Sequence, residues 1–174
     1  MSAPEVPSAR SLRVIKVVVN SGVGDSGEAR AKAERVLQMI THQKPVATRA
    51  RSTNRDFGIR AGQEIGVKVT LRGDNALDFL QRALEARDRQ LDPESIDRSG
   101  NFSFGIADYT DFTGMRYDPQ IGIHGMDISV EMGRAGWRLR DRRIAPKPLP
   151  GRVRATRDET RAYLKERFQV AFLE

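Results

Sequence analysis

Several segments of this chain alternate between apolar and polar side chains at every second position, which is typical of a β-strand with one buried and one exposed face. The clearest case is residues 65–72, in which Ile65, Val67, Val69 and Leu71 alternate with small or polar residues. Four other strands are predicted. The first is a β-branched run at residues 13–19, the second is a short segment at residues 46–50, and the last two alternate at residues 102–106 and 126–132.

Other segments carry apolar residues at the spacing of an α-helix. After residue 28 an apolar face is formed by Ala29, Ala33, Val36, Leu37 and Ile40. A second helix is predicted at residues 74–86, with Phe79 near the edge of a face formed by Leu77, Leu80 and Leu84. A last helix is predicted to be lined by Leu164, Phe168, Ala171 and Phe172.

Polar residues stand where these helices are expected to begin. Asp25 with Glu28, and Thr156 with Glu159, have the spacing of a capping box, in which each residue of the pair bonds the other's backbone amide. Asp74 suits the N-cap of the middle helix. We therefore expect the three helices to begin close to these residues.

The order of these elements predicts the fold class. Residues 46–50, the loop at 52–63 and the strand at 65–72 form a hairpin with an extended tip, and no regular alternation of strand and helix follows. We therefore expect an α+β fold, with a mostly antiparallel sheet and helices packed on one side. Residues 1–12, which include Pro4 and Pro7, are predicted to be a flexible tail, and residues 13–174 a single domain.

Composition narrows the classes of function. The chain has 174 residues, 39% hydrophobic and 30% charged, which is enough for one hydrophobic core. It has no cysteine, which excludes disulfides, thiolate metal sites and a cysteine nucleophile. No apolar run is long enough to cross a bilayer or to act as a signal peptide. A cytoplasmic protein without membrane contact is expected.

The positive charge is concentrated in two segments. Residues 44–72 hold seven basic and two acidic residues, and residues 134–157, here called the basic arm, hold nine basic and one acidic. Their net charges of +5 and +8 add up to +13, whereas the whole chain has +7, so the remaining chain has a net charge of −6. Two basic segments on an otherwise acidic chain indicate a polyanionic partner, although two solvated faces would show the same pattern.

Three glycines suggest an alternative function, the binding of a dinucleotide. Gly22, Gly24 and Gly27 spell G-x-G-x-x-G between a strand and a helix, the layout of a dinucleotide-phosphate cradle. However, Arg49 and Arg51 stand where an acidic residue would bind ribose, and the strands alternate in polarity, unlike parallel Rossmann strands. We expect a tight strand-to-helix turn here. An NADP-dependent oxidoreductase remains the alternative among enzymes, and a general RNA chaperone the alternative suggested by charge alone.

Other candidate chemistry is sparse. His42 and His124 have no partners at metal-ligand spacing, and loop solvation accounts for the aspartates at positions 108, 111, 118 and 127. The tripeptide at residues 72–74, Arg-Gly-Asp, fits a strand-to-helix turn. No catalytic constellation is present, so we expect neither an enzyme nor a bound cofactor or metal.

A long series of motifs resembles the universal large-subunit ribosomal protein five family. Residues 39–73, MITHQKPVATRARSTNRDFGIRAGQEIGVKVTLRG, follow the family's T-G-Q-x-P turn, basic strand, F-x-[IL]-R-x-G loop and I-G-x-K-V-T-L-R-G strand. The family's N-x-G-V-G matches residues 20–24, and GNFSFGI, YDPQIGIHGMDISV and the basic arm resemble its archaeal and eukaryotic branch. His42 replaces the usual glycine of the turn, and Ser21 a larger apolar residue.

The resemblance implies a structural protein of the large ribosomal subunit that binds 5S ribosomal RNA in the central protuberance. Asn20, Gln43 and Thr70 stand at the positions that the family uses against this RNA, and their amide and hydroxyl groups can bond a 2′-OH or a base edge. Phosphate contacts are expected from four basic residues, Lys16, Lys44, Lys68 and Arg72.

Further partners also follow from the resemblance. The loop, with Arg51, Arg55, Phe57 and Arg60, is expected to contact peptidyl-site transfer RNA, with Gly58 and Gly62 as flexible points. Large-subunit ribosomal protein eighteen and small-subunit ribosomal protein thirteen are the expected protein partners. The basic arm is expected to order on large-subunit ribosomal RNA through six arginines, Arg138, Arg140, Arg142, Arg143, Arg152 and Arg154.

Overall fold

The computed structural model of the chain describes residues 11–24 and 27–173. A five-stranded sheet forms its centre, with strands in the order β2-β3-β1-β6-β5 and every neighbouring pair antiparallel. Its strands are β1 (Arg13–Gly22), β2 (Val46–Arg49), β3 (Glu64–Leu71), β5 (Phe102–Ile106) and β6 (Met126–Gly133). This confirms the α+β class and the predicted hairpin of β2 and β3. An antiparallel sheet is not a Rossmann sheet, so the dinucleotide-binding fold is wrong.

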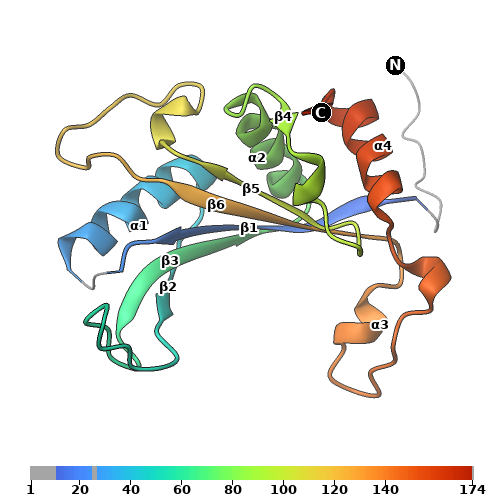
Figure 1. Cartoon of the computed structure of the whole chain (residues 1–174), viewed down its shortest axis with the longest axis horizontal. Coiled ribbons are helices and arrows are strands. Elements are labelled where there is room, and N and C mark those ends of the chain that lie inside the picture. The colour runs from blue at the N-terminus through green and yellow to red at the C-terminus, as the bar shows by residue number, and fades with distance from the viewer. Residues whose placement is uncertain (1–10, 25–26, 174) are drawn as a thin grey trace.

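Helices cover one face of the sheet. Figure 1 shows α1 (Glu28–Thr41), α2 (Asp74–Glu85) and α4 (Arg157–Phe168) on the same side of it. The basic arm contains the short helix α3 (Arg138–Asp141) and the 3-10 turn η3 (Gly151–Val153). The remaining elements are η1 (Pro93–Ser95), η2 (Tyr109–Asp111) and a parallel pair, β4 (Gln90–Leu91) with β7 (Ala171–Phe172). No helix among the described residues is long and apolar enough to span a membrane.

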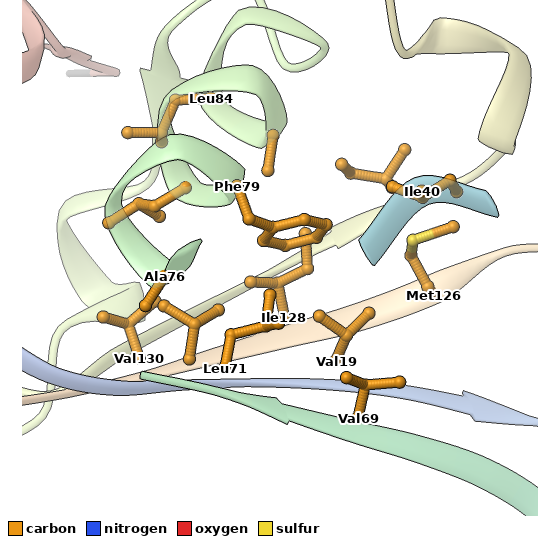
Figure 2. Close-up of a cluster of buried hydrophobic side chains, with 14 of the residues drawn as sticks. Val19, Ile40, Val69, Leu71, Ala76, Phe79, Leu84, Met126, Ile128 and Val130 are labelled. Atoms are coloured by element: carbon orange, nitrogen blue, oxygen red, sulfur yellow. The ribbon is translucent and has the colours of Figure 1, made fainter. Parts of the chain in front are cut away.

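The hydrophobic core lies between the sheet and these helices. In Figure 2, the ring of Phe79 from α2 lies above Val19, Leu71 and Ile128 of the sheet, and Ile40 of α1 lies on the same side of the sheet. All five side chains are buried. The alternating strand residues thus face the core as predicted, which leaves their polar neighbours on the opposite side of the sheet.

The predicted face of α2 was misplaced. Phe79 was expected at its edge but is almost fully buried, and its ring centroid lies 5.8 Å from that of Phe112. Leu77, expected inside, is only partly buried. The buried stripe includes Ala76, Leu80 and the small Ala83, so the helix is rotated relative to a face defined by leucines alone.

Two of the three predicted N-caps are also wrong. Gly73, with φ 62°, is the N-cap of α2, and Asp74 is already helical. Gly27 is the N-cap of α1, with no side-chain cap, while Asp25 lies outside the described residues. The capping box of Thr156 and Glu159 is confirmed. At α2 the chain turns into the helix through the positive φ of Gly73, a conformation that glycine adopts without strain and aspartate does not.

The last helix ends earlier than predicted. Gln169 adopts a left-handed conformation, with φ 56°, and ends α4 after Phe168. Ala171 and Phe172 therefore lie in β7, beside β4, instead of in the helix. Their spacing from Leu164 fits a helix, but the turn at Gln169 directs them to a second small sheet.

Candidate nucleic-acid interface

The face of the sheet opposite the helices, here called the open face, collects several predicted RNA-binding residues. The strand register places Lys68 of β3 directly beside Asn20 of β1. The next position along β3 that faces the same way is Thr70, which lies beside Val18. Lys68 and Thr70 are exposed and Asn20 is half-buried. Three residues far apart in sequence are thereby neighbours on one surface.

The boundaries of this group differ slightly from the prediction. The first strand was predicted at residues 13–19, but β1 continues past Asn20 to Gly22. The first helix, α1, ends at Thr41, and Gln43 follows in the turn. Gln43 is half-buried, whereas Lys44 beside it and Arg72 after β3 are exposed. The turn leads into β2, whose first residue pairs with Lys68, so this segment borders the open face.

His42 holds this turn in a left-handed conformation, with φ 54°, and its backbone N–H donates to Gln38 O at 2.9 Å. The turn is fixed further by Thr41, whose hydroxyl donates to Leu37 O at 2.6 Å. The position where the family motif has glycine therefore requires a positive φ here, and a residue with a Cβ is strained in it.

Ser21, the second residue that departs from the family pattern, is accommodated without strain. Its side chain is buried, and its hydroxyl donates to Gly125 O at 2.9 Å. Since the buried polar group has a partner, serine replaces an apolar residue here at little cost. This bond also ties β1 to the segment that leads into β6.

Lys16 is less available for phosphate than the sequence suggested. Its Nζ lies 2.8 Å from Glu131 Oε2, and Arg140 of the basic arm lies 2.8 Å from Glu131 Oε1. Burial alone raises the pKa of Glu131, but the bonds from Lys16 and Arg140 outweigh it and lower the pKa below its ordinary value. The carboxylate thus stays charged and holds both cations.

The chain of ion pairs continues within the arm. Arg140 Nε donates to Asp141 Oδ1 at 2.8 Å, which lowers the pKa of Asp141 and raises that of Arg140. The remaining predicted arm residues Arg138, Arg142, Arg143 and Arg154 are exposed, and Arg152 lies in the turn η3. Exposed arginines on a short, irregular segment suit phosphate contacts.

The arm has more structure than its irregular sequence suggested. The helix α4 anchors it through an ion pair of Arg134 with Glu159, and Arg134 also donates to the Arg154 carbonyl. Lys147 N donates to Leu139 O at 3.1 Å, which closes the loop after α3. Few of its side chains are buried apart from Ala155, so polar contacts hold most of it in place.

The loop between β2 and β3, residues 50–63, is here called the hairpin tip. It is an ordered extension of the hairpin: Ala50 and Gln63 pair at its base, and Asn54 and Ile59 exchange hydrogen bonds of 2.8 and 2.9 Å further out. Gly58 and Gly62, the predicted flexible points, have φ angles of 65° and 84°, which are typical of glycine in tight turns.

All four predicted contact residues of the hairpin tip are exposed. Arg55 begins the terminal turn, in which Gly58 N donates to Arg55 O at 3.1 Å, and Phe57 in that turn is 75% exposed. Arg60 directly follows Ile59 of the Asn54–Ile59 pair, and Arg51 directly follows Ala50 at the base of the tip. A large aromatic side chain presented to solvent between arginines can stack on a base or ribose.

Sequence reasoning missed the acidic edge of the open face. Asp127 of β6 lies beside Asn20, and Ser129 lies beside Val18. The alternation of β6 predicted that both would face away from the core, but nothing local revealed that β6 adjoins β1. The basic and amide groups therefore occupy the β1–β3 half, and carboxylates the β6 half.

The hairpin tip and the basic arm flank the open face. In Figure 1 the hairpin tip and the basic arm project from opposite ends of the sheet, both away from the side that α1 and α2 cover. No group of three or more possible metal ligands occurs among residues 11–24 and 27–173. The arrangement can bind an extended polyanion by charge and hydrogen bonds.

Comparison with known families agrees with this geometry. The family model described as "Ribosomal protein L5" matches residues 9–60, and a second model, which describes the C-terminus of the same ribosomal protein family, matches residues 64–172. Together they cover the whole sheet and both basic segments except residues 61–63.

Individual relatives are similar over almost their full length. The large ribosomal subunit protein uL5 of Picrophilus torridus is 50% identical over 167 residues, which is 95% of each chain. The uL5 protein of Thermoplasma volcanium is 48% identical, with 90% of this chain and 92% of the relative covered. That of Methanoregula boonei is 47% identical, with 92% and 98% covered.

Proposed function

Since the chain belongs to the ribosomal protein L5 family, whose members are structural constituents of the large ribosomal subunit and not enzymes, we propose that its open face binds 5S ribosomal RNA within that subunit. The observation that carries the proposal is the register of β1 and β3. It brings Asn20, Lys68 and Thr70 together on an exposed surface.

The chemistry of these side chains suits RNA. The amide of Asn20 and the hydroxyl of Thr70 can donate to or accept from a 2′-OH or a base edge, while Lys68 neutralises phosphate. Gln43, Lys44 and Arg72 at the border of the open face extend the same surface. Lys16 contributes only after it leaves Glu131, to which it is bound at 2.8 Å.

The two flanking segments have separate roles in this proposal. The exposed Arg55, Phe57 and Arg60 of the hairpin tip contact peptidyl-site transfer RNA through its backbone, without reading its sequence. The arginines of the basic arm contact large-subunit ribosomal RNA. Contacts with large-subunit ribosomal protein eighteen and small-subunit ribosomal protein thirteen rest on the family resemblance alone.

Calorimetric titration of the full chain tests the 5S assignment. The chain is titrated with 5S RNA, with an unrelated RNA of the same length and with NADPH. We expect tight binding of 5S RNA, weaker and strongly salt-dependent binding of the unrelated RNA, and none of NADPH. Equal affinity for both RNAs would favour a general RNA chaperone, and NADPH binding without 5S binding would refute the proposal.

A further inference from the structure

Trp137 in the basic arm lies between two hollows of the surface. The inner one, a cavity of about 280 Å³, lies where the arm meets the ends of β1 and β6, and much of its lining is apolar, including Ile15, Met132 and Val153. The outer one, of about 320 Å³, is lined by Arg13, Gly136, Trp137, Arg138, Leu139 and Arg142. The indole is half-buried and lines both.

The arginines of the two hollows differ in their partners. In the inner cavity two of the three arginines are occupied, because Arg134 pairs with Glu159, and Arg140 with Glu131 and Asp141, whereas Arg154 has no carboxylate partner among the described residues. In the outer hollow, by contrast, no carboxylate among the described residues pairs with the three guanidinium groups. The outer hollow is therefore positively charged and available to an anion.

A cavity of this size, at the lower end of the range for small-molecule pockets, suits a single flat ring system. Its polar lining includes the exposed Ser99, whose hydroxyl has no hydrogen-bond partner among the described residues. Glu131 also lines it, but Lys16 and Arg140 neutralise that carboxylate. A partly apolar slot with an aromatic wall, beside three guanidinium groups that no carboxylate pairs with, matches a base joined to a phosphodiester chain.

We propose that Trp137 and these two hollows form a binding site for one unpaired nucleotide of ribosomal RNA. The base turns across the indole into the inner cavity, and the neighbouring phosphates lie against Arg13, Arg138 and Arg142. One free hydroxyl at the base edge gives little sequence preference. The inference rests on the proposed function for the kind of partner, and it deepens it by giving the basic arm a specific stacking contact.

The chain's single tryptophan makes the proposal directly measurable. Indole emission of the full chain is followed during titration with a single-stranded oligoribonucleotide, with inorganic polyphosphate of equal charge and with a mononucleotide. We expect quenching by the oligoribonucleotide, none by polyphosphate and only weak quenching by the mononucleotide. Equal quenching by polyphosphate would reduce the site to charge attraction, and mononucleotide binding as tight as that of the oligomer would indicate a free nucleotide as the ligand. Either result overturns the proposal.

Variants separate stacking from charge. Measured by anisotropy of a labelled oligoribonucleotide, Trp137→Ala should weaken binding about ten- to a hundredfold with an unchanged salt slope, and Trp137→Phe should retain most of it. Arg138→Ala should flatten the salt slope by about 0.7. Tyr117→Ala, at an aromatic residue that is 57% exposed outside the arm, is the matched control and should have no effect. Unchanged affinity in Trp137→Ala would refute the stacking role.

The failure of this site is distinguishable from failure of the 5S interface. Thr70→Ala on the open face should weaken 5S binding but leave quenching by the short oligoribonucleotide intact. If an acidic peptide quenches the indole and the oligoribonucleotide does not, the arm binds a protein and the nucleotide site is refuted, whatever the result with 5S RNA.

Discussion

His42 occupies a backbone conformation that favours glycine. With φ 54° at the C-terminal cap of α1, its Cβ approaches the neighbouring carbonyl, which costs about 1 kcal/mol or more. The conformation persists because Thr41 and the remainder of the turn hold it, and it sets the path of Gln43 and Lys44. The strain is thus located at the entry to the proposed RNA surface.

Replacing His42 by glycine should therefore stabilise the protein. We expect His42→Gly to raise the free energy of unfolding by up to about 1 kcal/mol, because relief of strain exceeds the added entropy of the unfolded chain. His42→Ala is the control and should bring no gain, since alanine keeps the Cβ. Urea denaturation measures both. Equal stability of the glycine and alanine variants would show that the turn stores no strain.

Thr70 and Lys68 should contribute to RNA binding in different ways. Thr70→Ala removes a hydrogen bond from a desolvated interface and should weaken 5S binding by about 1–3 kcal/mol without changing its salt dependence. Lys68→Ala should flatten the log–log salt slope by about 0.7–0.9. Lys16→Ala should flatten it less, because Glu131 already neutralises this lysine. Filter binding across salt concentrations distinguishes them. A change of slope alone in Thr70→Ala would contradict this division.

At the scale of elements, the spacing of apolar residues along the chain predicted the strands and helices that bury one face in the core. The period-2 alternation identified β3 and β6 because each strand has one face in the core. The spacing of Ala33, Val36 and Ile40 likewise identified the buried face of α1. Apart from the rotated face of α2, the errors lie at helix ends, where Gly73 and Gln169 adopt positive φ angles and replace the polar cap or the helical turn that the spacing suggested.

The hairpin tip is an element whose removal should leave the rest of the molecule intact. Ala50 and Gln63 already pair at its base, so replacing residues 51–62 by Asn-Gly closes a short hairpin at the same place. We expect unchanged folding and 5S binding, since neither the core nor Thr70 is altered. Ribosomes with the shortened chain should hold peptidyl-site transfer RNA less firmly, measured by its dissociation rate.

A milder variant controls for the shortened backbone. Arg55→Ala combined with Arg60→Ala keeps the hydrogen bonds of the tip, which come from backbone groups and from the side chains of Thr53, Asn54 and Gln63. It should reproduce part of the loss of transfer-RNA binding. If 5S binding collapses in either variant, the tip belongs to the 5S interface and its assignment to transfer RNA fails.

At the scale of the whole molecule, the sheet order decides which residues form a site. Strand β1 lies between β3 and β6, so Asn20 adjoins both Lys68 and Asp127. Periodicity reveals the outward face of each strand but not its neighbours, because pairing between distant segments depends on packing of the complete core. The family resemblance predicted that Asn20 and Thr70 act together. The strand register places both on the same face of adjacent strands.

The same arrangement concentrates positive charge at the two ends of the open face. The hairpin tip and the basic arm project on the side of the open face (Figure 1), while the covering helices α1, α2 and α4 together hold as many acidic as basic residues. RNA is thereby attracted to the side of the open face. The open face lies between the hairpin tip and the basic arm, so an RNA bound there is contacted in the middle as well as at both ends.

Retention of the chain in the ribosome should therefore depend on 5S RNA. If the open face binds 5S RNA as proposed, removal of this RNA leaves the basic arm as the main contact with large-subunit RNA, and few buried side chains hold that arm. We expect the chain to co-sediment with intact large subunits and to be released from 5S-depleted subunits at a much lower salt concentration. Arg138→Ala with Arg142→Ala should lower the release point of depleted subunits further while changing that of intact ones little. If depleted subunits retain the chain to the same salt concentration as intact ones, the arm is the principal anchor and the open face is secondary.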